Sequence, residues 1–279
     1  MLVAIIGAGT MGSGIAQACA VTGYQVIMRD LNEAALARGQ GAIEQSLARI
    51  VKKGNLSEEA KVEALARIET VTDLSACAKA DIIIEAVFED IKVKKELWQA
   101  LNEHLRPDTL LATNTSSLSA TEIASFVAYP ERFCGLHFFN PVAMMPLVEV
   151  VKALQSSDDT MAQAKSFVES IGKSPIVCAD KPGFIVNRLL VPYINDAVHA
   201  LSEGIASAED IDKAMKLGAN MPIGPLALAD LVGLDVQLAA SESLYKEFGD
   251  SKFRVAPLVR QMVRAGKLGR KTGEGFYKY

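Results

Sequence analysis

Gly7-Ala8-Gly9-Thr10-Met11-Gly12 follows the apolar run of residues 2–6 and opens a helical pattern over residues 13–21. In a G-x-G-x-x-G turn of this kind, the first glycine permits a tight turn and the second lets the backbone approach a pyrophosphate. The third glycine lets the helix pack on the strand. Asp30 ends the next apolar run, where a carboxylate accepts hydrogen bonds from the adenosine ribose and repels a 2′-phosphate. This stretch predicts a nicotinamide dinucleotide site and favours NAD over NADP.

Each of these features also has a purely structural explanation. The glycine stretch can be a tight turn without a ligand, and Asp30 can be a turn residue or a helix N-cap. Arg29 lies beside Asp30 and would meet a 2′-phosphate if its side chain turned toward the site. NADP therefore stays as the less favoured alternative.

Short apolar runs alternate with helical patterns through the first part of the chain. Between the second and third runs, within residues 31–68, apolar residues recur at helical spacing. Lys53-Gly54-Asn55 interrupts this pattern and Ser57 restarts it as an N-cap, which predicts a helical hairpin. Four nearly continuous apolar runs bounded by turn or polar residues are expected to be buried strands: residues 2–6, 24–29, 81–87 and 109–113.

The pattern changes at Asp180-Lys181-Pro182-Gly183, after which only helices separated by Gly and Pro are expected. Before this point the sequence predicts a strand-rich stretch over residues 133–151, a helix near 158–171 and a strand at 176–178. The predicted fold is therefore α/β. A Rossmann-type doubly wound sheet with an inserted helical hairpin occupies residues 1–181, and an all-α domain for substrate closure and dimerisation occupies residues 182–279.

The composition excludes several classes of protein. The chain has 279 residues and a formal net charge of -4, without the basic stripe that is typical of nucleic-acid binding. No apolar run approaches the roughly 18 residues of a membrane span, and Met1 runs into the first strand without the features of a secretory signal. Four dispersed cysteines and three dispersed histidines predict no disulfide framework and no metal site, in a cytoplasmic protein.

His137 is the candidate catalytic base, and it lies in Gly135-Leu136-His137-Phe138-Phe139-Asn140-Pro141. An imidazole titrates near neutrality and can take a hydroxyl proton as hydride leaves the same carbon. Glu149 lies in another apolar run, where a carboxylate is costly unless it is paired. A chain that turns at Pro141 and again near Pro146 would bring Glu149 to His137. One pairing would explain both residues, although a core histidine without a catalytic role is commoner.

Two further polar groups lie in positions that suit a substrate. The strand near residue 110 runs into Asn114-Thr115-Ser116-Ser117, where hydroxyls could bind a substrate oxygen. Ser119, with Glu122 three residues later, is first interpreted as a helix cap. Asn187 interrupts an apolar helix and needs a partner, which a substrate pocket or ordinary interdomain hydrogen bonds would supply equally well.

Six ordered segments together resemble the 3-hydroxyacyl-CoA dehydrogenase family, and within it the single-function 3-hydroxybutyryl-CoA dehydrogenases. The resemblance spans the whole chain and implies an NAD-dependent oxidoreductase of fatty acid metabolism. Such an enzyme moves hydride between C3 of a 3-hydroxyacyl-CoA thioester and nicotinamide, while the C3 hydroxyl loses a proton. The apolar C-terminal helices fit the homodimer found in the family. The segments are residues 7–17, 85–90, 114–118, 135–141, 180–188 and 271–277.

The resemblance also implies roles for individual residues. It makes His137 the general base and Glu149 the residue that orients it and stabilises its cation. The positions that match substrate-orienting residues are Ser116, Asn140 and Asn187. The positions that match residues near the cofactor are Glu89, Lys94, Ser116, Asn140 and Lys271. The positions that match residues binding the acyl-CoA are Ser46, Lys53, Ser116 and Asn187. A lysine at the end of a helix, such as Lys53, is more commonly just solvated.

Two other functions stay open on the sequence. A dehydrogenase of free 3-hydroxyacids shares the N-terminal fold but uses a lysine as its acid and base, which the His137 and Glu149 pair disfavours. A protein that binds NAD(H) without turnover could keep the same fold for sensing or structure. The chain carries a full set of candidate catalytic residues, which argues against a protein that binds NAD(H) without turnover.

Overall fold

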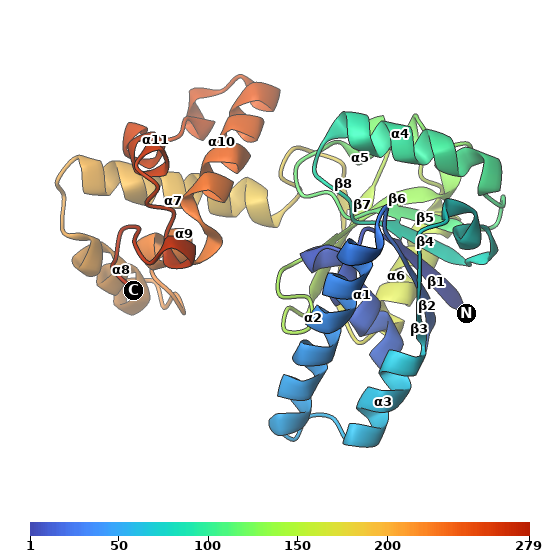
Figure 1. Cartoon of the computed structure of the whole chain (residues 1–279). Coiled ribbons are helices and arrows are strands. Elements are labelled where there is room, and N and C mark those ends of the chain that lie inside the picture. Colours follow the sequence, from blue (N-terminus) through green and yellow to red (C-terminus); the bar gives the residue numbers. More distant parts are fainter. The chain divides into compact units, whose positions relative to one another are not determined.

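Eight strands form a single sheet in the computed structural model, which describes residues 1–279 (Figure 1). The strands are β1 (Leu2–Ile6), β2 (Gln25–Arg29), β3 (Ile68–Val71), β4 (Ile82–Glu85), β5 (Leu110–Thr113), β6 (Phe133–Phe138), β7 (Leu147–Lys152) and β8 (Ser174–Ala179). Their order is β3-β2-β1-β4-β5-β6-β7-β8. The first six strands are parallel, β7 is antiparallel to β6, and β8 is parallel to β7. This is the doubly wound order of dinucleotide-binding sheets, with its switch point between β1 and β4.

The predicted strands are confirmed with small corrections at their ends. Residues 86 and 87, expected as the end of the third strand, lie outside β4 because the chain turns after Glu85. β3 was not predicted, and its placement at the edge of the sheet explains why. It has one buried residue, the exposed Glu69 and two half-buried residues, so it lacks the continuous apolar run of a central strand.

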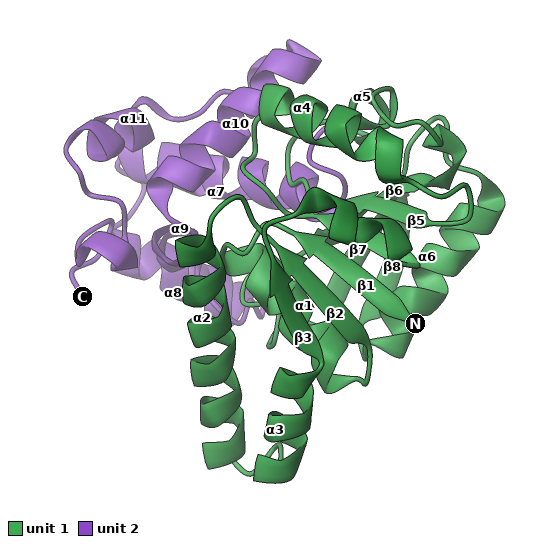
Figure 2. Ribbon diagram, turned by 45° about the vertical axis from the view of Figure 1, so that its right-hand side comes forward, with its two compact units in different colours: residues 1–181 green, residues 182–279 purple.

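Six helices belong to the same unit as the sheet, and four of them cover its faces. α4 and α5 lie on one face and α1 and α6 on the other (Figures 1 and 2). This follows from right-handed crossovers: the one through α1 leaves the switch point in the opposite direction from those through α4 and α5. The reversed direction of β7 then turns the crossover through α6 to the face of α1. The helices are α1 (Thr10–Val21), α2 (Glu33–Lys52), α3 (Glu58–Ala66), α4 (Ile91–Leu101), α5 (Ala120–Ala124) and α6 (Asp158–Ser170).

α2 and α3 form the predicted helical hairpin, which projects past the edge of the sheet (Figure 2). Gly54 takes a positive φ of 75° in the turn, a conformation that glycine adopts at little cost. The Ser57 side chain accepts a hydrogen bond from the backbone N–H of Ala60 at 3.1 Å, so it caps α3 as expected.

The chain divides into two compact units, Met1–Lys181 and Pro182–Tyr279. The second unit is helical, as predicted, and buries its own apolar core. Asp212 and Asp230 are buried in it and accept hydrogen bonds from the backbone N–H groups of Leu226, Ala227, Phe276 and Tyr277. None of the helices in the structure combines the length and apolar composition needed to cross a bilayer. The helices of this unit are α7 (Val186–Ser202), α8 (Ala208–Gly218), α9 (Pro225–Val232), α10 (Leu234–Phe248) and α11 (Pro257–Arg264).

Candidate active site

The three glycines of the turn after β1 have different packing environments. A Cβ at Gly7 would lie 2.5 Å from the carbonyl oxygen of Ala86, and Gly7 has a φ of +109°. A Cβ at Gly12 would lie 1.8 Å from the carbonyl oxygen of Gly7, so α1 could not pack this closely with any other residue. At Gly9 nothing lies within 4 Å of the same position. The first and third glycines are thus required by packing, while the second faces open space.

The space beside Gly9 is a cavity of about 940 Å³ at the carboxyl ends of the first strands. No side chain caps the N-terminus of α1, so its first N–H groups are available to an anion. The residues between β4 and α4 and one side of α4 form the opposite wall. Among the predicted cofactor residues, Gly7, Gly9, Thr10, Met11 and Asp30 line the cavity, whereas Gly12 does not and acts through packing. The other predicted cofactor residues do not line this cavity: Glu89, Lys94, Ser116, Asn140 and Lys271.

Asp30 shapes this cavity from the end of β2. Its carboxylate accepts hydrogen bonds from the backbone N–H groups of Ala8 at 2.8 Å and Leu31 at 2.7 Å. The N-cap of α2 is Asn32, so the alternative that Asp30 caps this helix is wrong. Arg29 also lines the cavity, but its Nε donates to the carbonyl oxygen of Thr72 at 3.1 Å.

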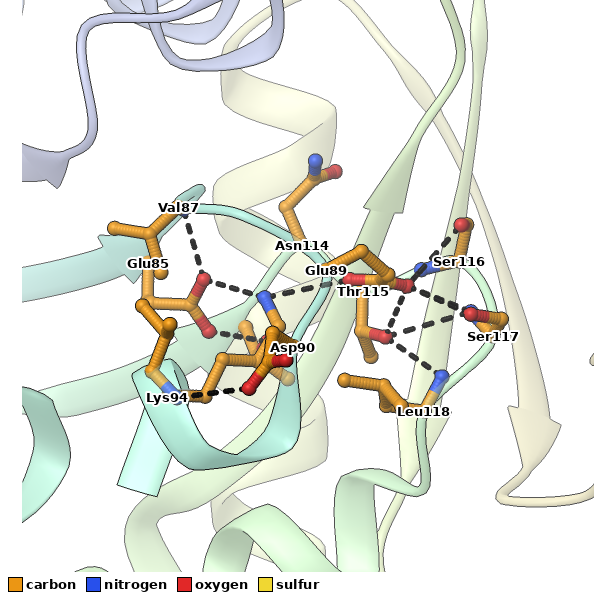
Figure 3. Close-up of polar contacts among 12 residues, drawn as sticks. Glu85, Val87, Glu89, Asp90, Lys94, Asn114, Thr115, Ser116, Ser117 and Leu118 are labelled. Atoms are coloured by element: carbon orange, nitrogen blue, oxygen red, sulfur yellow. Dashed lines mark hydrogen bonds and ion pairs between the residues drawn. The ribbon is translucent and has the colours of Figure 1, made fainter. Parts of the chain in front are cut away.

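A buried ion-pair network lies at the carboxyl ends of β4 and β5 (Figure 3). The ammonium of Lys94 is 2.6 Å from Glu85 Oε1 and 3.4 Å from Glu89 Oε2. Glu85 also accepts hydrogen bonds from the backbone N–H of Val87 at 2.9 Å and the hydroxyl of Thr113 at 2.7 Å. The side chains of Glu85 and Lys94 are both fully buried, and such charges persist only when paired and hydrogen-bonded.

Glu89 connects this network to the loop after β5. Its Oε1 accepts hydrogen bonds from the backbone N–H groups of Ser116 at 2.7 Å and Ser117 at 2.9 Å, and from the Thr115 hydroxyl at 2.7 Å. Burial alone would raise the pKa of Glu89, but Lys94 and these donors outweigh it and hold the pKa below its ordinary value. Glu89 is thus a carboxylate that fixes the conformation of the loop carrying Ser116.

His137 and Glu149 face each other across the antiparallel pair β6 and β7, where they occupy the same register position. His137 Nδ1 and Glu149 Oε2 are 2.6 Å apart, and both side chains are buried. Because a carboxylate only accepts, Nδ1–H is the donor, and a neutral imidazole then carries its lone pair on Nε2. The ring centroid of Phe139 lies 4.4 Å from that of His137. This is the arrangement of a histidine held in one tautomer by a carboxylate.

The structure brings the loop that carries Ser116 and the side chain of His137 to the same end of the sheet, where β5 and β6 end. β5 and β6 are neighbouring parallel strands, and Asn114, at the end of β5, accepts a hydrogen bond from the backbone N–H of Phe138 at 2.9 Å. Ser116 and Asn140 are both exposed at this end, one after β5 and the other after β6. Ser119 caps α5, as expected, by accepting from the backbone N–H of Glu122.

The other predicted site residues lie on the hairpin and in the second unit. Ser46 is half-buried on α2, and Lys53 is exposed at its C-terminal end. Asn187 is half-buried in the first turn of α7. Lys271 forms an ion pair with Asp235, with its Nζ 2.5 Å and 2.6 Å from the two carboxylate oxygens.

Sequence reasoning missed Glu85 and Thr113 as members of the site. Glu85 lies in the apolar run of β4 and is fully buried. It therefore carries the same signal as Glu149, a carboxylate in an apolar strand that needs a partner. In the structure no cluster of three or more His, Cys, Asp or Glu side chains could hold a metal ion.

Known proteins similar to this chain match it along its whole length. Residues 2–181 match the family described as 3-hydroxyacyl-CoA dehydrogenase, NAD binding domain, and residues 183–279 match the C-terminal domain of the same family. A 3-hydroxybutyryl-CoA dehydrogenase from Clostridioides difficile is 47% identical over 100% of this chain and 99% of its own length. A probable 3-hydroxybutyryl-CoA dehydrogenase from Deinococcus radiodurans is 46% identical over 99% of both chains.

A solved structure shows the same arrangement of elements. The crystal structure of (S)-3-hydroxybutyryl-CoA dehydrogenase from Ralstonia eutropha is 49% identical. It superimposes with a TM-score of 0.96 over 100% of this chain and 98% of that one.

Proposed function

The chain belongs to the 3-hydroxyacyl-CoA dehydrogenase family, and we propose that it interconverts 3-hydroxybutyryl-CoA and its 3-oxo counterpart with NAD as cofactor. The observation that carries this proposal is the buried pair of His137 and Glu149. It lies at the same end of the sheet as the dinucleotide cavity. The similar proteins that bear the name 3-hydroxybutyryl-CoA dehydrogenase support the choice of substrate.

His137 acts as the general acid and base in this proposal. In the oxidative direction its Nε2 takes the proton of the C3 hydroxyl, and Glu149 stabilises the imidazolium that forms. A charge-assisted hydrogen bond is typically worth about 1.5–3 kcal/mol, more than a neutral one. Ser116, Asn140 and Asn187 orient the substrate oxygen and the histidine. In the reductive direction the same proton returns from His137 to the oxygen.

The cofactor cavity suits NAD. The open position at Gly9 and the uncapped N-terminus of α1 fit a pyrophosphate, and Asp30 fits the adenosine ribose. The Nε of Arg29 is engaged with the carbonyl oxygen of Thr72 and is not offered to a 2′-phosphate, which supports NAD over NADP. When bound, the nicotinamide supplies the hydride acceptor or donor. Glu89 and the Ser116 loop hold the nicotinamide half, together with Asn140 and Lys271, and the buried Lys94 acts through its ion pair with Glu89.

The remaining roles concern substrate binding and assembly. Ser46 and Lys53 on the hairpin bind the coenzyme A part, with Lys53 offering an exposed cation to its phosphates. Residues 1–181 form the cofactor domain, and residues 182–279 close over the substrate and form the contact of a homodimer. The protein works in the cytoplasm, where its four free cysteines stay reduced.

Substitution of the base tests the mechanism. His137→Gln should lower kcat by roughly 10²–10⁴ and leave the dissociation constant for NADH nearly unchanged, because His137 does not line the dinucleotide cavity. His104→Gln is the matched control, since His104 lies between the end of α4 and the amino end of β5, and it should keep native turnover. Near-native turnover of His137→Gln would exclude His137 as the base.

A further inference from the structure

Two carboxylates share a single cation beside the dinucleotide cavity. Glu85 and Glu89 both contact the ammonium of Lys94, at 2.6 Å and 3.4 Å (Figure 3). The Glu85 carboxylate is the acceptor in each of its hydrogen bonds. The donors are the Lys94 ammonium, the Val87 backbone N–H and the Thr113 hydroxyl. We refer to Glu85, Lys94 and Glu89 as the triad. Two negative charges and one positive charge leave it with a net charge of about -1.

The triad lies where the nicotinamide half of a dinucleotide belongs. The strand order reverses between β1 and β4, and a dinucleotide bound across this point places one mononucleotide over each half of the sheet. Asp30, at the end of β2, marks the adenosine half. Glu85 ends β4, and Thr113 ends the adjacent β5. The residues between Glu85 and Glu89 form part of the cavity wall.

Little water screens the triad charge. The side chains of Glu85 and Lys94 are fully buried and that of Glu89 is only 33% exposed. In such surroundings a unit charge acts over a longer distance than on a solvated surface. Asp90 is the nearest further carboxylate along the chain, but it caps α4 by accepting from the backbone N–H groups of Lys92 and Val93. There the positive end of the helix dipole opposes its charge.

We propose that the triad keeps one uncompensated negative charge beside the nicotinamide half of the site and thereby favours the oxidised cofactor over the reduced one. The oxidised ring carries a positive charge and the reduced ring is neutral, so only the oxidised form is attracted by this charge. The proposal rests on the proposed use of NAD. It assigns Glu85 a role in selecting the cofactor's redox state, although Glu85 is too deeply buried to touch the cofactor.

Glu85→Gln removes the charge with little change in shape. The amide oxygen can keep the hydrogen bonds from Lys94 and Val87, which both donate to Oε1 in the native protein. The amide NH₂ then takes the place of Oε2 and donates to the Thr113 hydroxyl, which can accept as well as donate. The net charge of the triad changes from about -1 to about 0, while Lys94 and Glu89 keep each other as partners.

Dissociation constants for NAD⁺ and NADH, measured by calorimetry on native protein and Glu85→Gln without substrate, test the proposal. The ratio of the NAD⁺ constant to the NADH constant should rise about three- to tenfold in the variant, the scale of a unit charge in a water-poor site. Glu103→Gln removes the same charge from an exposed position after the C-terminal end of α4 and should leave the ratio unchanged. Thr113→Val removes a hydrogen bond of the network without changing its charge, and it too should leave the ratio unchanged.

The outcomes separate this proposal from the proposed function. Equal weakening of both cofactor forms in Glu85→Gln, or no change in either, would overturn the triad proposal and leave NAD as the cofactor. Failure of the native protein to bind either form would instead contradict the proposed function. If Glu85→Gln does not fold, Glu89→Gln removes one charge from the same triad. The ratio should then shift in the same direction, and an unshifted ratio would overturn the proposal.

Discussion

Glu149→Gln is the substitution whose effect on catalysis follows most directly from the structure. Glu149 Oε2 lies 2.6 Å from His137 Nδ1, and neither side chain is more than 7% exposed. The amide has nearly the same shape as the carboxylate, so the variant mainly removes a negative charge from the partner of the proposed catalytic base. In the proposed mechanism this charge stabilises the imidazolium that forms when His137 takes the substrate proton.

The size of the loss can be worked from this geometry. Two opposite unit charges centred about 4 Å apart attract by about 4 kcal/mol at an effective dielectric constant near 20. The amide oxygen can still accept from Nδ1–H, which returns about 1 kcal/mol. The net loss of about 3 kcal/mol corresponds to a decrease of roughly 10²-fold in kcat. An amide that turned its NH₂ toward Nδ1 would force the proton onto Nε2, and the loss would approach about 10⁴-fold.

Steady-state kinetics of NAD⁺ reduction with 3-hydroxybutyryl-CoA, the direction in which His137 takes the proton, measure this effect. We expect kcat to fall in Glu149→Gln while the dissociation constant for NADH stays within about twofold, because neither residue of the pair lines the dinucleotide cavity. Glu69→Gln on the edge strand β3 removes an exposed carboxylate and should keep native kcat. A kcat for Glu149→Gln within about threefold of native, in a folded variant, would refute the assigned role of Glu149.

Two further predictions concern the packing of the glycine turn and the buried carboxylate Glu89. Gly12→Ala places a Cβ 1.8 Å from the carbonyl oxygen of Gly7. It should destabilise the protein by about 1–3 kcal/mol and lower Tm, whereas Gly41→Ala on α2 has nothing within 4 Å and should not. For Glu89 the folded pKa is depressed, so its contribution to stability is present above the ordinary carboxyl pKa of about 4.3 and is lost as pH falls through the folded value. Urea unfolding at a series of pH values should show that the stability advantage over Glu89→Gln shrinks on acidification. A constant difference from neutral to acidic pH would contradict this.

Strong local patterns explain how much of the fold could be predicted from the sequence. The strand at residues 2–6, its glycine turn and the helical hairpin each carry a continuous signal within a short window. β3 lacks such a signal because an edge strand is buried on fewer sides, and Glu69 breaks its apolar pattern. The antiparallel direction of β7 depends on the turn between Pro141 and Pro146, which short-range patterns indicate only indirectly.

The candidate site was predictable where a residue had an unmet physical need. Glu149 required a partner in an apolar strand, and the turn after His137 placed one within reach. Glu85 had the same need, but its partner Lys94 lies on a helix among other charged residues. Nothing in that local pattern separates a fully buried lysine from solvated neighbours such as Lys92. Only the tertiary packing of α4 on the sheet reveals the pair.

In the proposed reaction this chain reduces a 3-oxoacyl-CoA thioester with NADH. The most direct test follows the absorbance of NADH with acetoacetyl-CoA and with free acetoacetate, each repeated with NADPH. We expect turnover with acetoacetyl-CoA and NADH, and a kcat/KM higher than with the free acid by roughly 10² or more, because the coenzyme A part supplies binding energy that the acid lacks. Faster reduction of free acetoacetate, or binding of NADH without turnover of acetoacetyl-CoA, would contradict the account.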